Sequence, residues 1–380
     1  MTIIKDRVLF SIYYMEENSL YLTTQIITYL GNKRRLLPYI DEEVRQIKKR
    51  IKKSRLLIGD LFSGSGVVAR GLKQHASHLF VNDIENYSYL LNSCYLTNKE
   101  EIDWKLYHRY YNQIQKEMDL TSVKGIIASN YAPKNNLKIK EGERVFYTKE
   151  NGIRIDSYRY LIDKIVKRQE YKKFFLAPLI VAASINANTS GVFKGFYKAC
   201  GIGCFGGAGK NSLVRILNPI SIKEIVLSNF SCDYTIYKED AVSLASSLPK
   251  LDLVYLDPPY NQHPYGSNYF MLNLIIENKI EVAVSKVSGI PENWQRSDFN
   301  RAITAGEALE NLLSNLKARY IILSYSSEGI IKFDELCNIL KKHGKVEIRE
   351  IPYCAFRGSR NLKNRPIYVK EYLFILKKSK

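Results

Sequence analysis

Buried β-strands are predicted for three short, mostly apolar segments of the chain, residues 56–62, 78–83 and 251–257. Each segment carries an acidic residue near its carboxyl end, and these acids are Asp60, Asp83 and Asp257. Ligands of open α/β sheets bind outside the carboxyl ends of the strands. The pattern therefore predicts that the three acids converge on one crevice at one edge of a sheet.

Other periodic segments extend the predicted sheet and supply its helices. Further strands are expected at residues 234–237 and 319–326, with a final antiparallel pair at residues 345–353 and 367–377. Helices are expected at residues 67–74, near 271–278, and after Pro38, where Asp41 is the predicted cap of a helix with a basic outer face. Residues 285–300 show no such periodicity and predict a mobile loop. Alternating strands and helices are typical of an α/β fold.

A glycine loop follows the first predicted strand. The sequence Ser63-Gly64-Ser65-Gly66 stands between a strand and a helix, which is the geometry that brings backbone N–H groups close to a ligand. The loop lacks the glycine spacing of dinucleotide sites and the ending of a phosphate loop, so it favours a nucleoside-like ligand without a pyrophosphate. If the loop stood alone, a tight strand–helix turn would be the preferred interpretation. The chain distance from this loop to Asp83 fits one strand–helix–strand step, and an acid there can bind both hydroxyls of a ribose.

The third predicted strand ends in Asp257-Pro258-Pro259-Tyr260. Proline cannot continue a strand ladder, so the backbone after Asp257 is expected to form a stiff, extended turn. The Asp257 carboxylate and the Pro258 carbonyl are both acceptors for an amino group, and the Tyr260 ring offers a face for stacking. This combination suits a planar ligand that carries an amino substituent.

The strand–helix alternation stops in the middle of the chain. We predict a catalytic domain formed by residues 1–98 and 213–380, interrupted by an inserted domain at residues 99–212. Residues 101–210 carry 19 basic and 10 acidic side chains. The mixture of cations, aromatics and hydroxyls at residues 153–160 is suited to phosphate contacts and base readout, although a plain surface has a similar composition. Residues 201–210 contain a glycine pattern without a preceding strand, which we interpret as a flexible hinge.

Composition narrows the choice of partners. The chain has 380 residues and a formal charge of +19, and a basic excess of this size favours a polyanion such as nucleic acid. The last 40 residues carry 12 basic and 3 acidic side chains, and a second phosphate-contacting surface is predicted there, around Arg357, Arg360, Lys363 and Arg365. The six cysteines include no CxxC pair, so no metal is expected. No signal peptide or membrane span is recognisable, which makes the cytoplasm the expected compartment.

Four motifs in this order resemble those of the amino-group DNA methyltransferases: Tyr-Leu-Gly-Asn-Lys at 29–33, Asp-Leu-Phe-Ser-Gly-Ser-Gly at 60–66, Asp83, and Asp-Pro-Pro-Tyr at 257–260. Their order, with a long insertion before the last motif, is similar to the alpha group that includes the Dam enzymes. Residues 268–269 and 324–329 resemble the members associated with restriction systems more closely. The similarity covers roughly residues 24–95 and 215–380, and the insertion is expected to be a target recognition domain.

The resemblance implies a Rossmann-like seven-stranded sheet that binds S-adenosylmethionine without a metal. The loop after the first strand would wrap the amino-acid part of the cofactor, Asp83 would bind its ribose, and Asp240 would bind its adenine, unless Asp240 is only a helix cap. The implied cofactor-binding residues are Tyr29, Gly31, Lys33, Asp60, Phe62, Ser63, Gly64, Gly66, Asp83, Asp240 and Asp257. The implied catalytic residues are Asp257, Pro258, Pro259 and Tyr260.

These residues predict methyl transfer to the 6-amino group of an adenine that is flipped out of duplex DNA. Acceptors at Asp257 and Pro258 would direct the nitrogen lone pair towards the sulfonium methyl, and transfer would be direct. The alternatives are an RNA adenine methyltransferase and an enzyme for the 4-amino group of cytosine, whose relatives more often carry Ser in place of Asp257. Less favoured are a protein glutamine methyltransferase, a non-catalytic DNA-binding relic and a dehydrogenase. Double-stranded DNA and a separately encoded restriction endonuclease are the expected partners, and a monomer or weak dimer the expected state.

Overall fold

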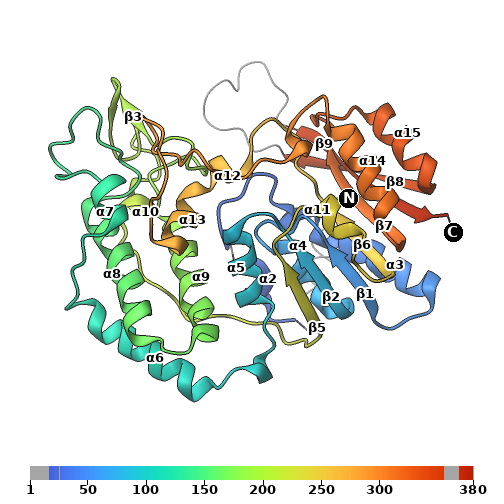
Figure 1. Ribbon diagram of the computed structural model, residues 1–380, viewed down its shortest axis with the longest axis horizontal. Coiled ribbons are helices and arrows are strands. Elements are labelled where there is room, and N and C mark those ends of the chain that lie inside the picture. Colours follow the sequence, from blue (N-terminus) through green and yellow to red (C-terminus); the bar gives the residue numbers. More distant parts are fainter. Residues whose placement is uncertain (1–16, 25, 355–367, 380) are drawn as a thin grey trace, which may run out of the picture.

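The computed structural model describes residues 17–24, 26–354 and 368–379, and a seven-stranded sheet forms its centre (Figure 1). The order across the sheet is β5-β2-β1-β6-β7-β9-β8. The strands are β1 (Leu56–Asp60), β2 (Ala76–Asn82), β5 (Asp233–Tyr237), β6 (Leu251–Leu256), β7 (Ala318–Ser326), β8 (Gly344–Cys354) and β9 (Tyr368–Lys378). Strands β5, β2, β1, β6 and β7 run parallel, whereas β9 is antiparallel to both of its neighbours. The expected Rossmann-like α/β sheet is confirmed.

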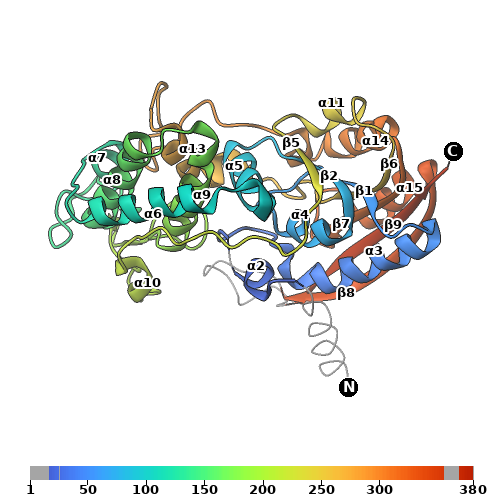
Figure 2. The same ribbon diagram turned by 90° about the horizontal axis from the view of Figure 1, so that it is seen from below.

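Helices cover both faces of the sheet because the central strands are apolar on both sides (Figures 1 and 2). In β6, Leu253 faces the core shared with α3 (Leu37–Ile51), α4 (Val67–Leu72) and α5 (Asn86–Tyr95). Its neighbour Val254 faces the opposite core, which contains α11 (Ala241–Ala245), α14 (Ala305–Asn315) and α15 (Phe333–His343). The smaller elements on the catalytic side are α2 (Ser19–Thr23), η1 (Lys33–Leu36), η2 (Lys73–His75), α12 (Tyr265–Asn268), α13 (Phe270–Glu277) and η4 (Asp298–Asn300).

The predicted cap at Asp41 is wrong. Helix α3 begins at Leu37, with Pro38 in its first turn, so Asp41 lies one turn inside the helix. Proline is favoured in a first helical turn, since its missing N–H has no intrahelical acceptor there. The Asp41 carboxylate instead accepts a hydrogen bond from Arg45 Nε at 2.7 Å and lies 2.6 Å from His75 Nε2. It therefore joins α3 to the segment that precedes β2.

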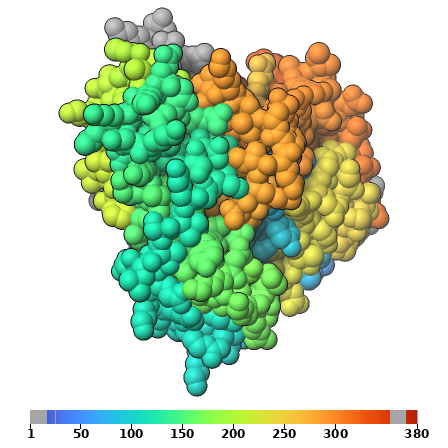
Figure 3. Space-filling model, turned by 60° about the vertical axis from the view of Figure 1, so that its left-hand side comes forward, coloured from blue at the N-terminus to red at the C-terminus, as the bar shows by residue number. Residues whose placement is uncertain are grey.

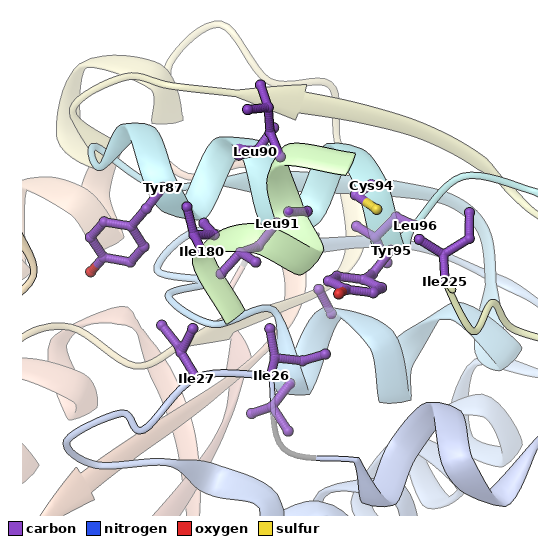
Figure 4. Close-up of a cluster of buried hydrophobic side chains, with 14 of the residues drawn as sticks. Ile26, Ile27, Tyr87, Leu90, Leu91, Cys94, Tyr95, Leu96, Ile180 and Ile225 are labelled. Carbon is purple, nitrogen blue, oxygen red and sulfur yellow. The ribbon is translucent and has the colours of Figure 1, made fainter. Parts of the chain in front are cut away.

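The middle of the chain is largely helical and packs directly against the sheet domain. It contains η3 (Lys99–Glu101), α6 (Trp104–Met118), α7 (Ile126–Asn130), α8 (Lys149–Ile165), α9 (Gln169–Ile185), the short strands β3 (Lys198–Ala199) and β4 (Ile202–Gly203), and α10 (Leu213–Leu217). Figure 4 shows Ile180 of α9 beside Leu91 of α5 and Ile26 of the N-terminal segment. Because these side chains are all buried, one apolar core continues from the helices in the middle of the chain to those that cover the sheet.

The interpretation of residues 201–210 as a flexible hinge is wrong. The segment predicted as a hinge contains half of a hydrogen-bonded hairpin, in which the Cys204 N–H donates to the Tyr197 carbonyl at 3.0 Å. Residues 153–160, for which phosphate and base contacts stay a prediction, lie within α8. There Arg154 Nε donates to the Ile220 carbonyl at 2.6 Å and Arg159 Nε to the Ile275 carbonyl at 3.0 Å. These two arginines fasten α8 to its neighbours.

The basic loop with Arg357, Arg360, Lys363 and Arg365 lies outside the described residues. Within the described part of the chain, none of the helices combines the length and the apolar character that crossing a lipid bilayer requires.

Candidate functional site

Strands β1, β2 and β6 are neighbours, so the segments that follow them meet at one edge of the sheet. A solvent-open crevice of about 650 Å³ lies there and is lined by Asp83, Asp240 and Asp257. Asp60 and Asp257 together line a smaller adjoining cavity. The structure thus brings together the acids that the strand pattern placed at one edge. Figure 3 shows a hollow on this side of the molecule, between the orange and yellow segments.

The glycine loop is held in place by Asp83. The N–H of Gly64 donates to Asp83 Oδ2 at 2.7 Å, and the N–H of Glu85 donates to Asp83 Oδ1 at 2.9 Å. Gly64 has φ +51° and Gly66 has φ +76°, a backbone region that glycine adopts more easily than other residues. A Cβ on Gly64 would lie 2.7 Å from the Tyr29 ring. The sequence therefore needs glycine at this position for both conformation and space.

Burial changes the ionisation of the acids around the crevice. Burial raises the pKa of Asp83 to about 6, against the effect of the backbone N–H groups of Glu85 and Gly64. Burial and the neighbouring Asp83 raise the pKa of Glu85 to about 8. Crowding of carboxyl groups in a poorly hydrated site favours their neutral forms. A bound ligand with positive charge or hydrogen-bond donors would favour their ionised forms, so these acids can respond to such a ligand.

Asp60 is fully buried, and the backbone N–H groups of Phe62 and Ala69 face its carboxyl group and oppose the rise of its pKa. Neither carboxyl oxygen makes a hydrogen bond of normal geometry with a described residue. Burial raises its pKa well above the ordinary value, and the nearby Asp257 and Asp83 add to this effect. A buried carboxyl group without a well-formed hydrogen bond is costly. Its place on the wall of a cavity therefore indicates that a donor group on a ligand completes it.

The Asp-Pro-Pro-Tyr turn follows directly after β6, and its acid is paired with a buried lysine. Lys33 Nζ, in η1, lies 3.3 Å from Asp257 Oδ1 and 3.3 Å from Glu371 Oε2. Burial raises the pKa of Asp257 to about 7 even though Lys33 opposes the shift. Burial would lower the pKa of Lys33, but Asp257 and Glu371 more than offset it and hold that pKa above its ordinary value. We therefore treat Lys33 as a permanent cation beside an acid that titrates near neutral pH.

The same turn separates two openings. Asp257 and Pro259 line the crevice, whereas Tyr260 lines a second solvent-open cavity of about 1300 Å³ that also contains Gly31. Pro258, between them, is buried. Lys33 Nζ lies 5.2 Å from the centroid of the Tyr260 ring. The position of Gly31 leaves room for this ring, because a Cβ there would lie 2.9 Å from the Tyr260 hydroxyl.

Aromatic rings line the two openings. Tyr29 borders both of them and stacks on Tyr265 and Tyr269, with ring centroids 5.0 Å apart in each case. Phe62 lines the crevice and meets the Phe299 ring edge-on at 5.1 Å. Flat apolar surfaces of this kind favour planar ligands.

Asp240 serves as a helix cap and also faces the crevice. Its Oδ1 accepts from the Ser243 N–H at 2.9 Å, which caps α11, and its side chain is exposed at the crevice wall. A carboxylate has about four acceptor positions, so the cap leaves capacity for a ligand donor. Ser63, by contrast, borders the small cavity beside Asp60.

Sequence reasoning missed many of the residues that line these openings, and five of them are instructive. Four of them, Gln295, Arg296, Ser297 and Asn300, come from the segment predicted only as a mobile loop, and they form part of the crevice wall. The fifth, Glu371, is the second partner of Lys33. A signal for Glu371 existed, because it is an acid at the start of an otherwise apolar strand pattern. The other segment has no periodicity from which its position could be inferred.

Comparisons with known proteins agree with this geometry. Residues 29–339 match the family model of the D12 class N6 adenine-specific DNA methyltransferases. The chain is 28% identical over 360 residues to the type II methyltransferase M.NlaIII of Neisseria lactamica, covering 93% of this chain and 100% of that protein. It is 29% identical over 361 residues to M.CviAII of Paramecium bursaria Chlorella virus 1, covering 92% and 98%. It is 27% identical to M.FokI of Planomicrobium okeanokoites, of which it spans 52%.

The matched region extends from Tyr29, at the border of both openings, through the Asp-Pro-Pro-Tyr turn to α15. It includes all of the strands that carry the converging acids. The chain therefore belongs to the D12 class N6 adenine-specific DNA methyltransferases and is an enzyme that methylates adenine in DNA.

Proposed function

We propose that this enzyme uses S-adenosylmethionine to methylate one adenine within a specific duplex DNA sequence, as the modification partner of a restriction endonuclease in the cytoplasm. The observation that carries the proposal is the Asp-Pro-Pro-Tyr turn, which forms a wall between the acidic crevice and the second cavity. Methyl transfer needs two ligands to meet at one point, and this wall is where the two openings approach each other.

The residues of the crevice fit S-adenosylmethionine. The buried Asp60 carboxyl would accept from the amino group of its methionine part, Asp83 from its ribose hydroxyls, and Asp240 from its adenine amino group. Phe62 and Tyr29 would cover its flat and apolar surfaces, and Gly31, Ser63, Gly64 and Gly66 would allow close approach of the backbone. The cofactor supplies a methyl group on a positively charged sulfur, which suits a site rich in carboxylates.

The second cavity is the proposed place of the target adenine. Its 6-amino group would donate to the Asp257 carboxylate and the Pro258 carbonyl, and the base would stack on Tyr260. The adjacent Lys33 ammonium favours the ionised, accepting form of Asp257. Because the target nitrogen is inaccessible within a duplex, the base must be flipped out, at a cost of roughly a few kcal/mol.

We assign recognition of the DNA to the insertion at residues 99–212. Its hairpin segment presents the exposed cations Lys194 and Lys198, and the adjacent Gly191 lines the second cavity. Exposed lysines that follow a cavity-lining residue closely in the sequence are suited to contact phosphates next to the flipped base. The similarity to relatives named as type II methyltransferases supports a site-specific reaction coupled to a restriction enzyme.

Tritiated S-adenosylmethionine and unmethylated DNA test this proposal. After digestion to nucleosides, we expect the label in N6-methyl-2′-deoxyadenosine, and single-molecule sequencing should place it in one short sequence motif. The Asp257→Ala variant should bind the cofactor and transfer no label. Label in 4-methylcytosine, or only in RNA, would overturn the proposal. Light scattering of the same preparation tests the expected monomer or weak dimer.

A further inference from the structure

Glu371 is a buried acid within the sheet. It lies in β9, next to Ser326 of β7 and Ile351 of β8, and its side chain is only 4% exposed. A carboxylate at this depth is unfavourable unless a cation and hydrogen bonds compensate it. The compensating group is Lys33, whose ammonium donates to Glu371 Oε2 at 3.3 Å. A buried position of β9 that could hold an apolar residue is thus occupied by the carboxylate of Glu371, which lines the second cavity.

Lys33 connects Glu371 to Asp257, the acid that is proposed to bind the target amino group. The same Nζ lies 3.3 Å from Asp257 Oδ1, and the Lys33 side chain is 3% exposed. Glu371 borders the second cavity and Asp257 the crevice, so the ammonium lies in the wall between the two openings. Solvent cannot replace either carboxylate as a partner for a buried ammonium, which makes the position of Nζ depend on both.

On the basis of the proposed function, we propose that Glu371 is a positioning residue for methyl transfer: it holds the Lys33 ammonium beside Asp257 and thereby sets the orientation and charge of the carboxylate that accepts the target amino protons. Glu371 touches neither ligand in this scheme and acts through Lys33. Without it, the ammonium would have one carboxylate partner and would move closer to Asp257.

The charge of Glu371 also affects Asp257 directly. The titratable groups around Asp257 come from several elements: Lys33 of η1, Asp60 of β1, Tyr255 of β6, Tyr260 of the turn, Tyr265 of α12 and Glu371 of β9. Burial raises the pKa of Asp257, Lys33 lowers it, and the negative charge of Glu371 raises it. Removing that charge while keeping the side-chain shape should therefore let Asp257 ionise at a lower pH.

The test measures the ionisation of Asp257 in the free protein. The carboxyl ¹³C resonance of Asp257 is assigned by its loss in Asp257→Asn. Its chemical shift is then followed as a function of pH in the wild type and in Glu371→Gln. The wild-type titration should have a midpoint of about 7. We expect the midpoint to fall by at least about half a unit in Glu371→Gln. The control is Asp252→Asn. Asp252 lies in β6, the strand that leads to Asp257, and its carboxylate pairs with Lys53. Its removal should leave the Asp257 midpoint unchanged.

Single-turnover methyl transfer supplies the second readout. In Glu371→Gln, the ratio of the rate at pH 6 to that at pH 8 should rise about 2.5-fold, which is the change in the ratio of ionised fractions when the midpoint falls from about 7 by half a unit. Glu371→Asp keeps the charge on a shorter side chain, so its midpoint should stay at the wild-type value while its rate falls about tenfold. Cofactor affinity should change little in either variant.

An unchanged midpoint together with a wild-type rate in Glu371→Gln would overturn the inference. If that variant does not fold, as judged by circular dichroism, Glu371→Asp decides, and a wild-type rate there would overturn it. Failure of the proposed function is distinguishable, because the wild type would then transfer no methyl to adenine while the ¹³C titration remained measurable.

Discussion

The backbone N–H of Gly64 donates a hydrogen bond of 2.7 Å to Asp83 Oδ2. This contact joins the loop that follows β1 to the acid that follows β2, so two parts of the proposed cofactor site hold each other in place. Asp83 therefore has a structural role, and a proposed role in binding the cofactor. Variants at the two residues can separate these roles.

Replacement of Asp83 by alanine should weaken the binding of S-adenosylmethionine by about ten- to a hundredfold, since hydrogen bonds to a charged group each contribute roughly 1.5–3 kcal/mol. Isothermal titration calorimetry with the purified protein measures this directly. Asp103→Ala is a suitable control, because Asp103 caps the distant helix α6. Equal affinities of the wild type and Asp83→Ala would remove Asp83 from the proposed site.

Replacement of Gly64 by alanine should reduce cofactor affinity more than backbone strain alone can explain. The added Cβ meets the Tyr29 ring at 2.7 Å, so either the loop or the ring must move. Gly142→Ala is the matched control: its φ is +84°, and nothing lies within 4 Å of an added Cβ. Both variants should lose about 1 kcal/mol of stability from the left-handed conformation. A similar loss of cofactor affinity in the two variants would contradict the prediction.

The stability of the free protein should fall as pH rises from about 4 to about 8. Burial raises the pKa of Asp83 to about 6 and that of Asp257 to about 7, and burial together with Asp83 raises the pKa of Glu85 to about 8. In this window the folded state binds more protons than the unfolded state, so each group contributes stability that is present below the unfolded pKa and lost as pH passes the folded pKa.

Asp257→Asn should therefore lose less stability than the wild type between about pH 5 and pH 8, a difference of a few degrees in Tm. Thermal unfolding followed by circular dichroism at both pH values checks this. Asp119→Asn, at the exposed end of α6, should keep the wild-type dependence. Parallel Tm curves for Asp257→Asn and the wild type would show that this acid does not titrate as described.

The double variant Lys194→Gln/Lys198→Gln should weaken DNA binding at all sequences. Each lost phosphate contact lowers the slope of log affinity against log salt by about 0.9. The control is Lys105→Gln/Lys116→Gln, which removes two exposed cations from α6, on another part of the insertion (Figure 1). Fluorescence anisotropy at several salt concentrations compares the two. Identical slopes would place the DNA elsewhere on the surface.

Much of the sheet and of its acidic edge could be predicted from the sequence, because both follow from local patterns. An apolar run that ends in an acid, as at Asp83 or Asp257, depends on a few neighbouring residues. Glu371 depends on an antiparallel strand from the far end of the chain that enters the sheet beside β7, and no local pattern gives its distance from Lys33.

Two side-chain partners could not be predicted from the sequence, for a common physical reason. The Arg154 guanidinium binds a carbonyl of a segment more than sixty residues away, and no local pattern indicates this contact. Asp41 was assigned to a cap because its residue type favours that position, whereas Pro38 fixed the helix start one turn earlier. In both cases the tertiary arrangement decided the partner.

The apolar seam between α5 and α9 has a consequence for engineering (Figure 4). Leu91 lies in the part of the chain proposed for catalysis, and Ile180 lies in the part proposed for DNA recognition. Both side chains are nevertheless buried in the same apolar cluster. A fragment that ends at residue 99 would expose this apolar surface to solvent and would be prone to aggregate. A chimera that takes residues 99–212 from a relative should therefore also take the apolar side chains that pack on α5. These side chains must be complementary in shape to the α5 surface of this chain.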